Sequence, residues 1–318
     1  MADVKHPVEK KERTQGNSGR RLPHVPADLL VDGLDAWLSA NCACADGPGC
    51  HADRVYAAAV FCAFCVPRAG LNQEALIAAK CCLLFFLIDD GPVEQLAEFN
   101  RFVDTGNRSG NEPAACLLSL IEDLEALGCD TRDVRSAIRN WAASMQREQS
   151  MAPGSALPGT HYALRRETIF VSCLVFCWLS LMRAGIPRAF TAECEELLEI
   201  AVRMVILAND LGSMHVDGTR PVGAETLVDI NSVLVRGRIL GSRQRAVEEA
   251  IDGYNSLALD FQERESALLR RVNSTNEELI KILTVVRSVV NGNLAGTRHL
   301  TGERYLGSSD TLMALHDI

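Results

Sequence analysis

The chain has 318 residues, of which 47% are hydrophobic and 23% are charged, and its formal net charge at pH 7 is −9. This composition is that of a globular protein with enough apolar side chains for a large core. The negative charge argues against a nucleic-acid-binding protein, because phosphate backbones are bound by clustered lysine and arginine. It leaves an anionic small ligand open, since a bound divalent cation can reverse the local charge.

The first 26 residues are polar and basic and contain no apolar segment of the signal-peptide type. We therefore expect a disordered basic leader over 1–26 and one α-helical domain over 27–318. Long proline-free stretches favour long helices there, because proline interrupts helix interiors, and no alternating strand pattern is found. The predicted helices cover 27–39, 54–66, 72–90, 93–105, 114–127, 131–148, 160–184, 189–212, 223–237, 242–270 and 276–297.

Two of these segments, 72–88 and 169–182, are apolar on nearly every face. Such helices belong in the centre of a bundle or line an apolar cavity. The segment 169–182 is shorter than the roughly twenty residues that span a bilayer, so no membrane association is expected. Several of the twelve cysteines lie inside apolar runs, where they are typical of small core side chains in a reducing compartment. We therefore expect a cytoplasmic protein.

An acidic cluster follows the first apolar segment, in the stretch FFLIDDGPVEQL (85–96). Asp90 and Glu94 are four residues apart and share a helical face, and Asp89 immediately precedes them. Such a cluster repels itself unless a cation or several hydrogen-bond donors compensate it. The alternative is a solvated helix end with three ordinary surface acids.

A second polar stripe follows another apolar run, in VILANDLGSMHVD (205–217). Asn209, Ser213 and Asp217 are spaced four residues apart, so their oxygens line one side of a helix. A carboxamide, a hydroxyl and a carboxylate are oxygen ligands that suit Mg²⁺ rather than zinc. The alternative is a set of polar residues that end a helix near Gly212.

These motifs resemble those of bacterial-type class I terpene synthases. DDGPVE (89–94) is similar to their aspartate-rich metal motif, and NDLGSMHVD (209–217) to their second metal-binding triad. HYALRRET (161–168) resembles the segment whose first arginine, here Arg165, senses diphosphate. NGNLAGTRHLTGERY (291–305) is similar to the C-terminal segment that ends in an Arg-Tyr pair, here Arg304 and Tyr305.

The resemblance implies a single-domain class I terpenoid synthase helical bundle around an apolar active-site cavity. It implies Mg²⁺-dependent ionisation of a linear isoprenyl diphosphate, farnesyl first and geranylgeranyl second, and cyclisation to a terpene hydrocarbon or alcohol. Three Mg²⁺ ions, replaceable by Mn²⁺, and a homodimer are further expectations. The implied metal ligands are Asp89, Asp90, Glu94, Asn209, Ser213 and Asp217. By the same alignment Thr168 is the linker and Ile169 the helix-break effector.

The residue types themselves also account for ionisation of a diphosphate ester. Metal ions held between the two acidic motifs would act as Lewis acids on the leaving diphosphate. Arg165 and Arg304 would add charge-assisted donors, and Tyr305 a further hydrogen bond. Phe85, one turn before Asp89, could stabilise positive charge by a cation–π contact. Four further aromatic residues are more typical of core packing: Phe86, Phe170, Phe176 and Trp178.

The chain also departs from the family pattern. Asp217 replaces the commoner glutamate, Val216 stands where many members carry lysine, Gly296 where tryptophan is common, and Ile169 where glycine is frequent. A chain-elongating prenyl diphosphate synthase is one alternative, but it would need a second DDxxD motif. A non-catalytic helical binding protein is the other. A cysteine-rich stretch, CACADGPGCH (42–51), matches no common zinc-finger spacing.

Overall fold

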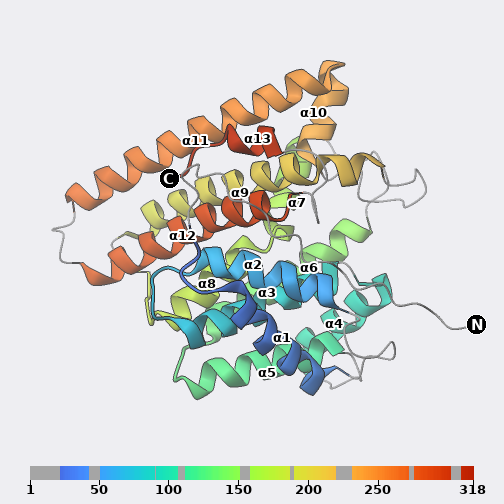
Figure 1. Cartoon of the computed structure of the whole chain (residues 1–318), viewed down its shortest axis with the longest axis vertical. Coiled ribbons are helices and arrows are strands. Elements are labelled where there is room, and N and C mark those ends of the chain that lie inside the picture. Colours follow the sequence, from blue (N-terminus) through green and yellow to red (C-terminus); the bar gives the residue numbers. More distant parts are fainter. Residues whose placement is uncertain are drawn as a thin grey trace, which may run out of the picture.

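The structure is a computed structural model that describes residues 22–42, 51–89, 91–106, 112–150, 158–186, 190–219, 231–271, 276–301 and 309–318. Every helix or strand element within these ranges is an α-helix (Figure 1), which confirms the all-α prediction. The helices are α1 (Ala27–Asn41), α2 (Ala52–Cys65), α3 (Asn72–Asp89), α4 (Val93–Thr105), α5 (Glu112–Ala126), α6 (Arg132–Gln149), α7 (Pro158–Thr168), α8 (Val171–Leu181), α9 (Thr191–Thr219), α10 (Ser232–Leu240), α11 (Arg243–Arg271), α12 (Glu277–His299) and α13 (Ser309–Met313).

The two helices predicted to be apolar all round, α3 and α8, pack against each other inside the bundle. In α3 every side chain from Ile77 to Leu84 is buried, and in α8 most are. Helix α3 also packs on α1, α2 and α5, and α8 on α6 and α12, so both are enclosed by other helices. Their cysteines are buried, as expected for core side chains.

Helices α9, α11 and α12 run side by side along one flank of the bundle (Figure 1). The buried residues of α11 recur every three or four positions, from Ala246 to Leu268, so this helix buries a single face. Helix α9 lies between α11 and α12 and contacts both. The backbone of Ile318 is hydrogen-bonded to α12. Asn291 Nδ2 donates to Ile318 O at 2.6 Å, and Ile318 N donates to Asn291 Oδ1 at 2.9 Å.

The continuous helix predicted over 160–184 is wrong, because α7 ends at Thr168 and α8 begins at Val171. The helix break that the resemblance implied at Ile169 lies at this place. Phe170 breaks the helix with a left-handed backbone conformation, φ 63°. Two contacts hold the break: Trp141 Nε1 donates to the Thr168 carbonyl at 3.1 Å, and the Phe170 ring packs edge-on against Trp141. The break therefore arises from tertiary packing on α6, which local helix propensity does not contain.

Other boundaries also differ from the prediction. Helix α9 continues to Thr219 instead of ending at 212, and α10 runs from Ser232 to Leu240, beyond the predicted end at 237. Helix α13 was not predicted. The leader predicted over 1–26 falls mostly outside the described residues, although Val25 is buried in the core. Over the described ranges we find no helix with the length and hydropathy of a membrane span.

Candidate functional site

The first predicted motif lies at the corner between α3 and α4. Asp89 is the last residue of α3, and Glu94 lies in the first turn of α4; both side chains are exposed. The amide of Gly91 donates to the Ile88 carbonyl at 3.2 Å, which turns the chain between the two helices. The third acid of the motif, Asp90, lies outside the described residues.

The structure brings Arg165 and Asn209 together. Arg165 lies in the last turn of α7, and its Nη2 donates to Asn209 Oδ1 on α9 at 2.8 Å. The same nitrogen lies 3.3 Å from Asp210 Oδ1. The Arg165 side chain is 15% exposed, and its Nε is buried with no hydrogen-bond partner among the described residues. Arg165 thus retains a buried donor for a further acceptor.

Carboxylates on three helices act on the charge of the Arg165 guanidinium, and one of them, Asp210, contacts it. Burial disfavours its charge, but Asp210 on α9, Glu148 on α6 and Asp89 on α3 outweigh that effect and raise the pKa of Arg165. Glu148 is buried, and its position at the end of α6 gives no motif in the sequence. Carboxylates on α9, α6 and α3 thus stabilise the charged form of Arg165.

Ser213 lies one helical turn after Asn209 and faces the start of α10. Asn231 Nδ2 donates to Ser213 Oγ at 3.2 Å and to the Asp210 carbonyl at 2.7 Å. The Asn231 Oδ1 in turn accepts from the first amides of α10, those of Val233 and Leu234, and caps that helix. Asn231 therefore fixes the Ser213 hydroxyl relative to α10.

Asp210 is a site residue that the sequence pattern missed. It is 1% exposed, and its Oδ2 accepts from Ser232 N at 2.8 Å and from Ser232 Oγ at 2.6 Å. Asp210 follows Asn209 directly, so it lies off the stripe that the spacing of four residues defines. A carboxylate that follows the apolar run 204–208 could have indicated a buried ion pair, because such a group requires partners.

An aromatic cluster adjoins the acidic corner. The ring of Phe85 lies 5.1 Å from that of Phe86, 5.2 Å from that of Phe170 and 5.9 Å from that of Trp141, measured between centroids. Phe85 is partly exposed, whereas the other three rings are buried. Phe86 and Phe170 therefore serve core packing, as predicted. Phe85 combines an accessible ring with a position one turn before Asp89.

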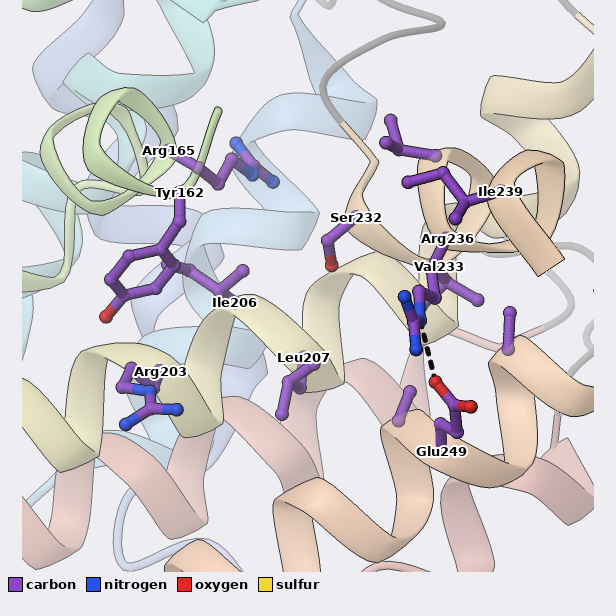
Figure 2. A pocket seen from close by; sticks show the side chains of 13 residues that line it. Tyr162, Arg165, Arg203, Ile206, Leu207, Ser232, Val233, Arg236, Ile239 and Glu249 are labelled. Carbon is purple, nitrogen blue, oxygen red and sulfur yellow. Dashed lines mark hydrogen bonds and ion pairs between the residues drawn. The ribbon is translucent and has the colours of Figure 1, made fainter. Parts of the chain in front are cut away.

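A cavity of about 320 Å³ lies between α7, α9, α10 and α11 (Figure 2). Apolar side chains such as Ile206, Leu207 and Val233 line it, and Arg236 pairs with Glu249 at 2.7 Å on its far side. Arg165 and Ser232 reach the cavity, but none of the described predicted metal ligands does.

The described oxygen donors fit a hard divalent cation. Asp89, Asn209 and Ser213 offer a carboxylate, an amide and a hydroxyl oxygen, which Mg²⁺ prefers. No group of three His, Cys, Asp or Glu side chains suited to a metal occurs within the described part of the chain. Asp90 and the side chain of Asp217 lie outside that part, as do both Arg304 and Tyr305.

Comparison with known proteins shows the fold. No protein-family model and no curated protein sequence matches the chain. Among solved structures, 2-methylisoborneol synthase from Streptomyces coelicolor, in complex with Mg²⁺ and 2-fluoroneryl diphosphate, matches with a TM-score of 0.73 and 15% identity over 90% of this chain and 96% of that one.

Two further structures agree. Linalool/nerolidol synthase from Streptomyces clavuligerus, in complex with 2-fluorogeranyl diphosphate, has a TM-score of 0.67 and 16% identity over 88% of this chain and 99% of that one. The SVS_A2 protein from ancestral sequence reconstruction has a TM-score of 0.68 and 20% identity over 88% and 87%. The chain therefore has the helical fold of the bacterial class I terpene synthases.

Proposed function

We propose that the chain is a Mg²⁺-dependent class I terpene cyclase. It would ionise a linear isoprenyl diphosphate, farnesyl first and geranylgeranyl second, and cyclise the carbocation to a terpene hydrocarbon or alcohol. The observation that carries the proposal is Arg165, which reaches Asn209 while its Nε stays buried and unpartnered among the described residues. An arginine held in this way suits a diphosphate oxygen as acceptor.

The oxygen ligands of both motifs would hold the metal ions, which we propose to be three Mg²⁺, with Mn²⁺ as a substitute. The proposed ligands are Asp89, Asp90, Glu94, Asn209, Ser213 and Asp217. Bound there, the ions would supply Lewis-acid stabilisation of the leaving diphosphate. The oxygen donors of Asp89, Asn209 and Ser213 support this assignment, because Mg²⁺ prefers such ligands. The Mg²⁺ bound to 2-methylisoborneol synthase supports it as well.

The remaining residues would bind the diphosphate and shield the cation. Arg165, Arg304 and Tyr305 would donate hydrogen bonds to the departing diphosphate. The partly exposed ring of Phe85 would face the positive charge that develops at the hydrocarbon end. The aromatic residues packed behind Phe85 would exclude water from the carbocation.

The test is incubation of the purified protein with geranyl, farnesyl or geranylgeranyl diphosphate, with Mg²⁺ or with EDTA, and analysis of the hexane extract by GC–MS. A Mg²⁺-dependent cyclic product is expected, and Asp89→Asn or Asn209→Ala should abolish it. Asp104→Asn, at an exposed acid of α4, is the matched control and should retain it. A longer prenyl diphosphate as product would instead identify a chain-elongating synthase. The absence of any product from folded protein would favour a non-catalytic binding protein.

A further inference from the structure

Asp210 is the side chain through which α7, α9 and α10 meet. Its Oδ1 lies 3.3 Å from Arg165 Nη2, and its Oδ2 accepts both the amide and the hydroxyl of Ser232. A carboxylate that is only 1% exposed is stable only where donors surround it. The three donors come from two other structural units, so Asp210 requires α7 and the start of α10 to be in place together.

This arrangement constrains the orientation of Arg165. Its Nη2 is shared between Asn209 Oδ1 and Asp210 Oδ1, both on α9. Because the guanidinium is planar and rigid, fixing one nitrogen against two acceptors fixes the plane in which the other donors lie. Asp210 therefore helps to hold Arg165 against Asn209.

A second residue, Asn231, also connects the first turn of α10 to Asp210. Asn231 Nδ2 donates to the Asp210 carbonyl and to Ser213 Oγ, while Asn231 Oδ1 caps α10. Asn231 and Ser232 thus bind both the backbone and the carboxylate of Asp210. Movement of the first turn of α10 would alter the contacts of Asp210 and Ser213 at the same time.

We propose that Asp210 is a positioning residue that holds Arg165 beside Asn209 and couples this pair to the first turn of α10. Asp210 itself does not contact the diphosphate or the metal ions; it acts through Arg165. The inference rests on the proposed function, since Arg165 is there the diphosphate donor.

A double-mutant cycle tests this dependence, with binding of inorganic diphosphate in the presence of Mg²⁺ measured by calorimetry. Asp210→Asn keeps the shape of the side chain and one acceptor oxygen, and should weaken binding about tenfold to a hundredfold. In an Arg165→Met background the same change should have no further effect, because Asp210 acts through Arg165. If Asp210→Asn weakens diphosphate binding equally in the wild type and in Arg165→Met, the proposal is overturned.

The matched control is Glu199→Gln. Glu199 also lies on α9 and pairs with an α7 arginine, Arg166, at 2.7 Å, but it does not contact Arg165 or Asn209 in the described structure. This variant should bind Mg²⁺–diphosphate as the wild type does. Should Asp210→Asn not fold, Ser232→Ala removes one donor to Asp210 and should weaken binding a few-fold, again only where Arg165 is present.

A crystal structure of ligand-free Asp210→Asn tests the positioning independently of any binding or turnover. We expect Arg165 Nη2 to lie beyond hydrogen-bonding distance of Asn209 Oδ1 in this variant and to remain bonded in Glu199→Gln. An unchanged Arg165–Asn209 bond in Asp210→Asn would overturn the proposal. A wild type that binds no Mg²⁺–diphosphate would overturn the proposed function instead, and the crystal structure would still decide the role of Asp210.

Discussion

Arg165 and Asn209 lie on different helices, α7 and α9, and a 2.8 Å hydrogen bond from Nη2 to Oδ1 joins them. The adjacent Arg166 contacts the same helix but at a different place, where its Nε pairs with Glu199 and its side chain is 55% exposed. Two neighbouring arginines thus differ in burial and in partner. Of these two arginines, Arg165 faces the predicted metal ligands of α9 and Arg166 does not, so the same substitution at the two positions can be compared directly.

We predict that Arg165→Lys lowers the rate of diphosphate release on the order of a hundredfold, because lysine lacks the planar fork that orients two donors. Arg166→Lys should leave the rate within about twofold, since an exposed ion pair contributes little. The measurement is steady-state release of diphosphate from the accepted substrate. Equal losses in the two variants would show that general positive charge on α7, rather than Arg165, is required.

A second prediction concerns ligand binding without turnover. Because the proposed ligands Asp89, Asp90 and Glu94 are carboxylates that would repel an anion, diphosphate should bind only together with a divalent cation. Mg²⁺ with diphosphate at about 100 times its dissociation constant should stabilise the fold by about 2.7 kcal/mol and raise the melting temperature by several degrees.

Thermal unfolding followed by circular dichroism measures this shift. Diphosphate with EDTA, and Mg²⁺ with sulfate, serve as controls and should leave the melting temperature near that of the free protein. An equal shift with diphosphate and EDTA would contradict a metal-dependent site.

The helix break at Phe170 supplies a third prediction, on stability. Phe170 has φ 63°, which costs a non-glycine residue about 1–2 kcal/mol, and its ring packs between Phe85 and Trp141. Phe170→Ala loses the ring and retains the strain, whereas Phe170→Gly loses the ring and relieves it. Phe170→Gly should therefore be about 1 kcal/mol more stable than Phe170→Ala, the reverse of the order within a helix.

Urea unfolding of both variants measures this difference. Alanine more stable than glycine would show that the left-handed conformation is not kept once the ring is removed. Both variants should be less stable than the wild type by about 2 kcal/mol or more, because a buried phenyl ring is lost.

Proline placement and apolar periodicity were enough to predict α3, α4 and α11 to within a residue or two, because these features act locally. The break at Ile169–Phe170 could not be predicted from these local features, and only the resemblance implied a helix break at Ile169. It depends on the Trp141 indole, which donates to Thr168 from a helix that is distant in sequence. Left-handed residues are expected at glycine, and here the residue is phenylalanine.

The residues of the candidate site also fall into two groups, those that sequence motifs predict and those that only tertiary packing reveals. Arg165, Asn209 and Ser213 follow from the sequence motifs; the structure places Arg165 against Asn209 between α7 and α9, and Ser213 beside the start of α10. Asp210 and Glu148 have no such spacing, and their role is visible only once the end of α6 and the start of α10 are packed around Arg165. Ion-pair partners of this kind are set by tertiary packing rather than by helical repeat.

The last prediction concerns Gly292, at the close contact of α12 with α2. A Cβ at this position would lie 2.6 Å from Cys65 Cα and 2.7 Å from its backbone nitrogen, so the two helices would have to move apart. Gly292→Ala should therefore destabilise the protein by about 1–3 kcal/mol, although alanine favours helices. Gly253→Ala in α11, where the nearest atom is 3.9 Å away, should instead stabilise it by about 0.5–1 kcal/mol.

The same displacement should reach the candidate site. One turn after Gly292, Gly296 packs on Phe61, and the Phe61 ring stacks on Phe86 beside Phe85. Moving α12 away from α2 would shift this aromatic cluster, which would line the carbocation in the proposed function. Gly292→Ala should thus change the product ratio seen by GC–MS, whereas Gly253→Ala should leave it unchanged. If Gly292→Ala and Gly253→Ala unfold at the same urea concentration, the contact of α12 with α2 accommodates the added methyl group without loss of stability.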